Sequence, residues 1–316
     1  MNTLPLVSII IPVYNGSNFL REAIDSALSQ TYKNIEVIVV NDGSNDDGAT
    51  EEIALSYGEK IRYICKENGG VSSALNLGIL NMKGEYFSWL SHDDSYMPDK
   101  IEKQINALNS VGHNDVIISC SVQNVNAKGE LLRKKSKSCL KMGFNEWHEA
   151  LDHMLMHGSF NGCSLLIPKK AFEKVGFFDE KLRYCQDAFM WMRIFLNKFG
   201  LIHIPDICVS NRIHGGQLTQ TGRALFYSDS ERISAEIAPL IANEKEHAKK
   251  LMYSYAFHNA VLNNKAVVKK CFEVSKTKKL LSPINKMKIR IVGIYGLIRP
   301  AIRKIYYKII QGIKTR

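Results

Sequence analysis

The sequence predicts an α/β protein built around a largely parallel sheet. In the first hundred residues, short runs rich in branched and aromatic side chains alternate with stretches of helical periodicity, which is typical of βαβ units. Each short run stops at a polar or turn-forming cluster. The chain has 316 residues, of which 45% are apolar, and this is enough to bury a substantial core.

The elements of the first hundred residues follow one another in a regular order. Strands are expected at Val7–Pro12, Ile35–Val40, Ile61–Cys65 and Tyr86–Leu90. Apolar residues three and four positions apart predict helices at Phe19–Leu28 and Val71–Leu80, with a weaker pattern at Ile53–Tyr57. A further helix carries Ile101, Ile105 and Leu108, and its first turn can hold Pro98.

Beyond residue 115 the pattern is mixed. Strands are expected at Val116–Val125 and Cys163–Pro168, and helices at Glu146–Met156 and Asp187–Asn197. Two or three helices should follow between Arg223 and Val274. We therefore expect a main α/β domain over residues 1–222, a helical extension over residues 223–275 and a basic amphipathic tail over residues 276–316.

The net charge of +11 is concentrated in this tail. Residues 276–316 hold twelve Lys or Arg and no Asp or Glu, which leaves 30 basic and 31 acidic residues in the rest of the chain. Because the nearly neutral body offers no extended basic face, we do not expect nucleic acid as a partner. The tail lacks the stretch of about 18 uncharged apolar residues that a spanning helix needs. Because Gly293, Gly296 and Pro300 interrupt a single helix, we expect two short amphipathic segments on an anionic membrane surface. A solvated basic helix packed on the domain is the alternative.

Two features indicate the compartment. The seven cysteines are odd in number and widely scattered, which favours a reducing environment. The N-terminal MNTLPLVSIIIPVYNG lacks a basic n-region and a small-residue cleavage site, so we interpret it as a buried strand rather than a signal sequence. Together with the tail, these features favour a cytoplasmic protein held peripherally on the inner leaflet of the plasma membrane.

Polar residues gather where each of the first four predicted strands ends. They are Tyr14 and Asn15, Asn41 and Asp42, Glu67 and Asn68, and Ser91 to Asp94. The carboxyl ends of parallel strands meet at one edge of a sheet, and ligands bind beyond that edge. We therefore expect a binding site there.

Two acidic clusters allow both a structural and a functional interpretation. Asp93 and Asp94 repel each other unless a cation or a cap uses them, so a metal site and a turn before a helix are both open. Asp42 lies in an Asn-Asp-Gly-Ser turn signal, which favours turn chemistry. A buried Asp at a strand end can also accept a hydrogen bond from a nucleobase N–H.

Two later residues are equally open. Asp187 precedes an amphipathic helix, where it can be an N-cap or a general base. His214 stands beside Gly215 and Gly216, which let the backbone approach a ligand closely. A lone histidine is more often structural than a ligand.

Five segments together resemble the inverting family-2 glycosyltransferases, which have the GT-A fold, a Rossmann-like mixed sheet flanked by helices. The segments are VSIIIPVYNG, NIEVIVVNDGSNDD, ENGGVSSALNLGI, GEYFSWLSHDDSYMPDKIEKQI and GFFDEKLRYCQDAFMWMRI, in the family's order over about residues 5–215. The resemblance implies a metal-dependent enzyme that moves a sugar from a nucleoside-diphosphate donor to a glycan or polyprenyl-linked acceptor hydroxyl. It further implies a role in bacterial surface polysaccharide synthesis.

The resemblance also implies roles for individual residues. Those expected around the donor nucleotide are Pro12, Val13, Tyr14, Asn15, Asp42, Asn68, His92 and Asp93. Among them, Asp42 would read the imide edge of a uracil-type base, which favours a UDP donor. Asp93 would coordinate Mn²⁺ or Mg²⁺ between the donor phosphates, with Asp94 and His214 supporting it. Asp187 would deprotonate the acceptor hydroxyl.

Two positions depart from the family pattern. Ser91 stands where an acid is usual, and Leu75 stands where many relatives have an arginine near the donor. A catalytically degenerate nucleotide-sugar-binding scaffold is therefore the alternative, although Asp42, Asp93 and Asp187 are retained. A sugar nucleotidyltransferase would carry a glycine-rich, Arg-containing loop after the first strand, where this chain has Pro12 to Asn15.

Overall fold

The computed structural model describes residues 4–110, 116–132, 140–217 and 222–294 of the chain. The chain divides into two compact units: unit 1 comprises residues 1–150 and 159–226, and unit 2 comprises residues 151–158 and 227–316. The division at residue 226 lies four residues beyond the boundary expected from the sequence. Residues 276–294 fall in the same unit as residues 227–275.

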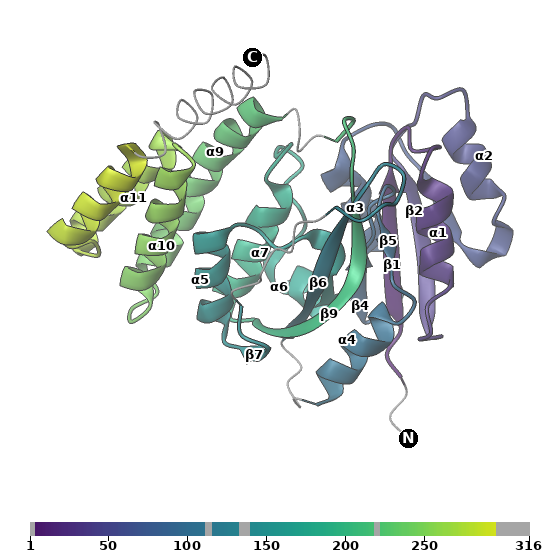
Figure 1. Ribbon diagram of the computed structural model, residues 1–316, viewed down its shortest axis with the longest axis horizontal. Helices are drawn as coiled ribbons and strands as arrows, with labels where there is room; N and C mark the ends of the chain where they lie inside the picture. The colour runs from purple at the N-terminus through teal and green to yellow at the C-terminus, as the bar shows by residue number, and fades with distance from the viewer. Residues whose placement is uncertain (1–3, 111–115, 133–139, 218–221, 295–316) are drawn as a thin grey trace, which may run out of the picture. The chain divides into compact units, whose positions relative to one another are not determined.

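Unit 1 is built on a mixed sheet, in which nine strands can be assigned among the described residues (Figure 1). The strand order is β3-β2-β1-β4-β8-β6-β9-β5, with β7 beside β9. The first four strands, β1 (Val7–Val13), β2 (Ile35–Asn41), β3 (Arg62–Cys65) and β4 (Tyr86–Trp89), pair in parallel. The predicted α/β fold with a mixed sheet is confirmed, and the predicted strand ends are within one residue of those observed.

Helices connect the parallel strands by crossovers. Among the first of them are α1 (Leu20–Leu28), α2 (Ala49–Leu55), α3 (Val71–Asn81) and α4 (Lys100–Asn109). α1 buries Leu20, Ala23, Ile24 and Ala27, the three-to-four spacing that the sequence shows. α2 begins four residues before the predicted Ile53, because the Asp46 carboxylate accepts the Thr50 N–H and hydroxyl in its first turn.

The second half of the sheet differs from the expectation. The strand β8 (Leu165–Pro168) runs antiparallel to both β4 and β6 (Val116–Asn126). The 14-residue β9 (Gly200–Ile213) was not predicted, because its burial pattern does not alternate and its pairing with β6 shifts register near Ser121. The remaining short elements are β5 (Ser95–Tyr96), β7 (Gly143–Asn145), α5 (Trp147–His157), α6 (Lys169–Val175) and α7 (Gln186–Leu196).

The C-terminal region is helical, as expected. It contains α9 (Arg223–Ala242), α10 (Ala248–Val261) and α11 (Lys265–Lys278), and residues 283–294 are helical too. Among the described residues, no helix combines the length and the apolar character needed to cross a bilayer. The part of the expected tail from residue 295 onward lies outside the described residues.

A lysine is fully buried in the core of unit 1, under the end of β4. The Lys100 Nζ donates to Ser88 Oγ at 3.0 Å and to Gln104 Oε1 at 2.8 Å, and it lies 4.1 Å from the centroid of the Tyr96 ring. Loss of water around the ammonium lowers the pKa of Lys100 to about 8. No carboxylate is among these contacts, so the ammonium is held by neutral acceptors and an aromatic face.

This environment predicts a pH-dependent stability difference between the native chain and Lys100→Met. Between pH 7 and 9.5 the unfolded lysine keeps its proton while the folded one loses it, so the unfolded state binds more protons and stability rises with pH. We expect the native chain to gain about 2 kcal/mol relative to Lys100→Met over this range. Urea unfolding of both proteins at several pH values measures the difference, and a constant difference contradicts the assignment.

Candidate functional site

Three of the four polar clusters at the strand ends line two adjoining cavities in unit 1, whereas Glu67 and Asn68 line neither. The smaller has a volume of about 220 Å³ and the larger about 1020 Å³. The residues that line both are Tyr14, Val71, Ser91, His92 and Asp93. The smaller cavity adds Pro12, Val13, Asp42 and Ala74, and the larger adds among others Asn15, Asp94, Asp187 and His214. The structure thus brings the predicted site residues together, with the exception of Asn68.

Asp42, at the end of β2, holds the loop that follows β3. Its Oδ1 accepts hydrogen bonds from Lys66 Nζ at 2.8 Å and from the Gly69 N–H at 3.0 Å. Its Oδ2 accepts from the Gly70 N–H at 2.7 Å. Gly70 has a φ of +90°, which a residue with a side chain rarely adopts. Turn chemistry is therefore one function of Asp42, and the same side chain lines the smaller cavity.

The loops after β1 and β2 are joined by a reciprocal amide pair. Asn15 Nδ2 donates to Asn45 Oδ1 at 2.7 Å, and the Asn45 N–H donates to Asn15 Oδ1 at 2.8 Å. Asn15 has a φ of +49°, a conformation that asparagine tolerates better than most residues. Asn68 is exposed and lines a separate pocket of about 610 Å³ on the loop that Asp42 holds.

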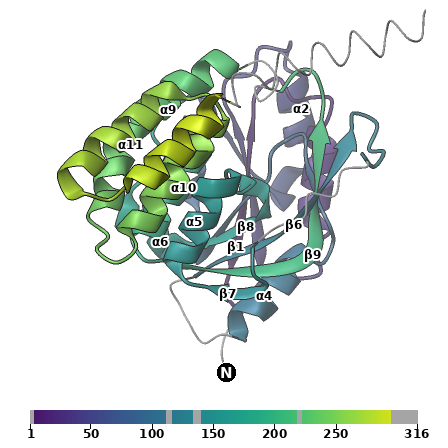
Figure 2. The same ribbon diagram turned by 60° about the vertical axis from the view of Figure 1, so that its left-hand side comes forward.

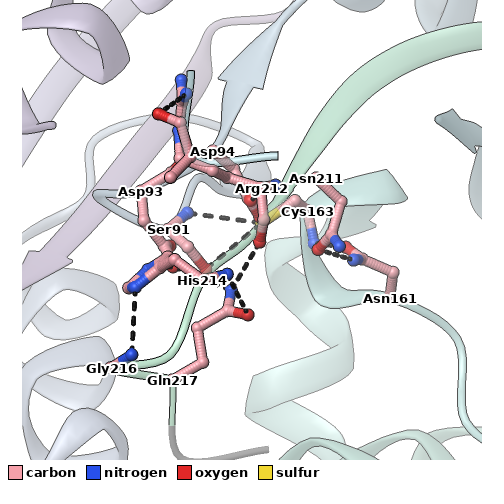
Figure 3. A network of polar contacts seen from close by, with 11 residues as sticks. Ser91, Asp93, Asp94, Asn161, Cys163, Asn211, Arg212, His214, Gly216 and Gln217 are labelled. Atoms are coloured by element: carbon pink, nitrogen blue, oxygen red, sulfur yellow. Dashed lines mark hydrogen bonds and ion pairs between the residues drawn. The ribbon is translucent and has the colours of Figure 1, made fainter. Parts of the chain in front are cut away.

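Asp93 points toward the end of β9, where two side chains contact one of its oxygens (Figure 3). Gln217 Nε2 donates to Asp93 Oδ2 at 3.0 Å, and His214 Nε2 lies 3.0 Å from the same oxygen. With the ring proton on Nε2, His214 donates to Asp93 and its Nδ1 accepts the Gly216 N–H at 3.3 Å; with the proton on Nδ1, Nε2 presents a lone pair at the same position. His214 therefore has an acidic partner and is not a lone histidine.

The neighbouring Asp94 is used differently from Asp93. Its Oδ1 accepts the Arg212 N–H at 2.8 Å, and its Oδ2 accepts from Cys163 Sγ at 3.3 Å. Burial, followed by the charge of Asp93, raises the pKa of Asp94 to about 7. Asp94 thus connects β4 to β9 and to the residues before β8, and both of its oxygens already have protein donors.

Arg212 is a residue of the site that the sequence reasoning did not identify. Its Nε donates to the Asp93 carbonyl at 2.9 Å, its Nη1 to the Ala127 carbonyl at 3.2 Å, and its Nη2 pairs with Glu22 at 2.6 Å. The guanidinium also lies 4.7 Å from the Phe19 ring centroid. In the sequence, Arg212 is recognisable only as an arginine two positions before His214. A pattern of two residues does not indicate a role in the site until the fold is known.

Asp187 is the second residue of α7 and lines the larger cavity. Its Oδ1 accepts the N–H of the next residue, Ala188, at 2.6 Å. The helix is capped by Cys185, so the interpretation of Asp187 as the N-cap is wrong. Burial raises the pKa of Asp187 to about 6, which suits a group that accepts a proton near neutral pH.

Two buried polar atoms on the larger cavity have no hydrogen-bond partner among the described residues. They are the Trp89 indole Nε1, a donor, and Gln186 Oε1, an acceptor. The Trp89 ring lies against Gly162, where a Cβ would come within 2.5 Å of it. Asn161 and Asn211, joined by a hydrogen bond of 3.1 Å, add amide groups to the same cavity (Figure 3). This cavity therefore suits a ligand rich in hydroxyl groups.

Asp93 and His214 are the candidate ligands for a divalent cation in this site. The described residues contain no cluster of three or more His, Cys, Asp or Glu side chains arranged around a metal position. However, the 3.0 Å between Asp93 Oδ2 and His214 Nε2 is the separation of adjacent ligands around an octahedral ion at about 2.1 Å. Mg²⁺ is commonly held by one or two carboxylates together with substrate phosphates and waters. Asp93 and His214 fit a site of this kind.

The structure shows the surroundings of the two residues that depart from the family pattern. Ser91 contacts Cys163, with its N–H 3.3 Å and its Oγ 3.4 Å from the sulfur. Its side chain adds a hydroxyl to the cavity wall in place of a carboxylate. Leu75 is fully buried in α3 and lines neither of the two cavities. An aliphatic residue is therefore compatible with its position in the core.

Comparisons with known proteins identify the family of the chain. The family model "Glycosyl transferase family 2" matches residues 8–176. An uncharacterized glycosyltransferase of Rickettsia prowazekii is 54% identical over 223 residues, which are 69% of this chain and 67% of the relative. A second one, from Rickettsia conorii, is 44% identical over 318 residues, 98% of this chain and 51% of the relative. The hyaluronan synthase of Pasteurella multocida is 32% identical over 221 residues, 68% of this chain and 21% of the relative.

The chain thus spans about half the length of the Rickettsia conorii relative and about a fifth of the hyaluronan synthase. Among solved structures, Staphylococcus aureus TarS 1-349 in complex with UDP-GlcNAc aligns with a TM-score of 0.68 and 17% sequence identity. The alignment covers 95% of this chain and 92% of that one, and it shows a shared GT-A fold. The family model matches more than half of the residues of this chain, and the chain therefore belongs to glycosyl transferase family 2.

Proposed function

We propose that this glycosyltransferase transfers one sugar from a UDP-sugar to an acceptor hydroxyl, with inversion at the anomeric carbon and with the help of Mn²⁺ or Mg²⁺. The observation that supports this best is the shared cavity of about 1020 Å³, which is lined by Asp93, His214 and Asp187. The cavity adjoins the smaller one, which Asp42 lines, at Tyr14, His92 and Asp93. A donor nucleotide and an acceptor hydroxyl can thus bind against different walls of one continuous site.

Asp93 and His214 are the residues that would hold the cation beside the donor phosphates. A divalent cation bound there supplies stabilisation of the negative charge that builds on the departing diphosphate. The Gln217 amide that donates to Asp93 Oδ2 keeps the carboxylate oriented toward His214. Asp94, held by Arg212 and Cys163, fixes the turn on which Asp93 stands.

Asp187 would accept the proton of the attacking hydroxyl. With a pKa of about 6, it is largely ionised at neutral pH and is still basic enough to take up a proton during attack. A single displacement by the acceptor inverts the anomeric configuration. The unpartnered Trp89 Nε1 and Gln186 Oε1 on the same wall suit sugar hydroxyls or amides near the reacting groups.

The choice of UDP rests on the shape of the smaller cavity and on the solved relatives. The walls of the cavity include Pro12, Val13 and Tyr14, with the Asp42 carboxylate beside them. TarS 1-349 has been solved with UDP and with UDP-GlcNAc. A uracil-type base in this cavity would place its imide edge within the reach of Asp42.

For the acceptor, we propose a glycan or a polyprenyl-linked glycan in bacterial surface polysaccharide synthesis. The enzyme would act on the cytoplasmic side of the plasma membrane, held at the inner leaflet by the basic residues of 276–316. This proposal rests on the concentration of twelve Lys or Arg in that segment. A catalytically degenerate scaffold, motivated by Ser91, is the competing proposal.

Donor binding separates the two proposals. We expect calorimetry with UDP, GDP, TDP and CDP to show preference for UDP, strengthened by Mn²⁺. Asp93→Asn should lose at least tenfold in affinity with Mn²⁺, because a carboxamide binds a hard cation poorly. The matched control Asp206→Asn removes a carboxylate that pairs only with Lys103 in the described structure, and it should bind like the native chain. The absence of metal-enhanced binding for all four nucleotides would favour the scaffold.

Asp187→Asn tests the base. The variant should lose about 10²- to 10⁴-fold in kcat while its UDP affinity stays the same, because the group acts on the acceptor proton. Glu173→Gln, an exposed carboxylate on α6, serves as the control. If kcat changes less than threefold in Asp187→Asn, another group removes the proton.

The pH profile gives a further test of the same residue. A base must be ionised to act, so activity should decline as the pH falls through about 6 and should be retained above it. The midpoint of the acidic limb of the kcat/KM profile should thus lie at a pH well above the ordinary pKa of an aspartate, which is about 4. Initial rates between pH 4.5 and 8 at saturating metal locate it, and a limb near pH 4 contradicts a desolvated base.

A further inference from the structure

Unit 2 carries an exposed apolar stripe on its last described helix. In residues 283–294, the side chains of Ile284, Met287, Ile291 and Ile294 are exposed by 61, 54, 57 and 58%. Their spacing of three, four and three residues places them on one side of the helix. Ile289, on the other side, is fully buried. The helix therefore has one apolar face in the core and a second one in solvent, which is unusual for a free surface.

Basic residues border this stripe on both sides. The helical spacing places Lys288 next to one edge of the stripe and Arg290 next to the other, and both are exposed. Residues 283–294 contain no Asp or Glu, and the sequence of residues 295–316 has six further Lys or Arg and again no acid. The stripe is thus surrounded by positive charge.

An apolar groove of about 770 Å³ adjoins the stripe within unit 2 and is lined mainly by α11 and by residues 289–294. Helix α11 lies beside α10 (Figure 2). Its apolar lining includes Val268, Phe272, Ile289 and Ile294. Its cations are Lys265, Lys269, Lys276 and Arg290, and the acidic Glu273 that also lines it lies 4.0 Å from Lys269. The groove therefore repeats the combination of apolar and basic side chains seen on the stripe.

A buried amide at this groove lacks a partner. Asn264 is 2% exposed, and its Oδ1 accepts the Val267 N–H at the start of α11. Its Nδ2 is buried and makes no hydrogen bond within the described structure. An unpaired donor beside lysines suits an anionic or ester oxygen.

We propose that these residues form a basic–apolar face that binds an anionic lipid bilayer. The face comprises the stripe of Ile284, Met287, Ile291 and Ile294, its flanking Lys288 and Arg290, and the groove beside α11. The stripe enters the acyl region while the cations contact the headgroup phosphates. This inference deepens the membrane role proposed above for residues 276–316 by assigning it to a defined face.

Other occupants fit less well. A nucleic acid would neutralise the cations and leave four apolar side chains in water. A second copy of the chain, related by a twofold axis, would bring Lys288 and Arg290 close to the same residues of its partner. An anionic bilayer satisfies the charges and the apolar stripe together.

Vesicle flotation of the full chain tests the proposal. The native chain should bind vesicles of phosphatidylcholine with about one quarter phosphatidylglycerol, bind phosphatidylcholine alone only weakly, and dissociate at high salt. Ile284→Ser/Met287→Ser/Ile291→Ser should bind at least tenfold more weakly. Lys288→Gln/Arg290→Gln should lose roughly 30-fold on anionic vesicles. The control Leu55→Ser/Leu80→Ser/Leu131→Ser changes similarly exposed side chains of unit 1 and should bind like the native chain.

Three results would overturn the proposal: equal vesicle binding by the stripe variant and the native chain, no preference for anionic vesicles, or a stripe variant that changes only the oligomeric state in light scattering. UDP binding is measured on the same proteins and should be unchanged in all variants. Loss of vesicle binding with intact UDP binding supports the face. A native chain that binds vesicles but no nucleotide supports the face and contradicts the proposed enzymatic function.

Discussion

The buried contacts of Arg212 hold the two halves of the candidate site together. Its backbone N–H and its guanidinium reach the turn after β4, which is more than a hundred residues away in the chain. A buried guanidinium is costly to desolvate unless its donors are used, and here a carbonyl, a carboxylate and an aromatic face surround it. Because His214 follows two residues later, the position of the histidine relative to Asp93 depends on this arginine.

Four aspartates in the candidate site have different roles because their surroundings differ. Asp42 and Asp94 have their oxygens occupied by protein donors and serve to hold loops and strands in place. Asp93 contacts His214 and Gln217, Asp187 accepts the Ala188 N–H, and both line the larger cavity, as Asp94 also does. Asp94 thus helps to position Asp93, its neighbour on the same turn, while Asp42 shapes the wall of the smaller cavity.

The sequence predicted the first half of the fold closely, because its βαβ units depend on local patterns of buried strands and amphipathic helices. β1, β2 and β4 lie within one residue of the expected ranges, and the site lies at their carboxyl ends. The roles of Arg212 and Asp94, and the unpredicted β9, depend on pairing between distant segments. Local periodicity carries no information about such pairing. The burial of Leu75 likewise follows from how α3 packs on the sheet.

The loop at residues 66–70 has a consequence for ligand entry. Since Asp42 already accepts hydrogen bonds from Lys66, Gly69 and Gly70, the wall of the smaller cavity takes its shape when the chain folds, before any ligand arrives. In the proposed function, an entering base would meet a preorganised surface, and its binding would cost the protein little conformational entropy. Steric fit and the imide contact with Asp42 would then select the base without any loop rearrangement.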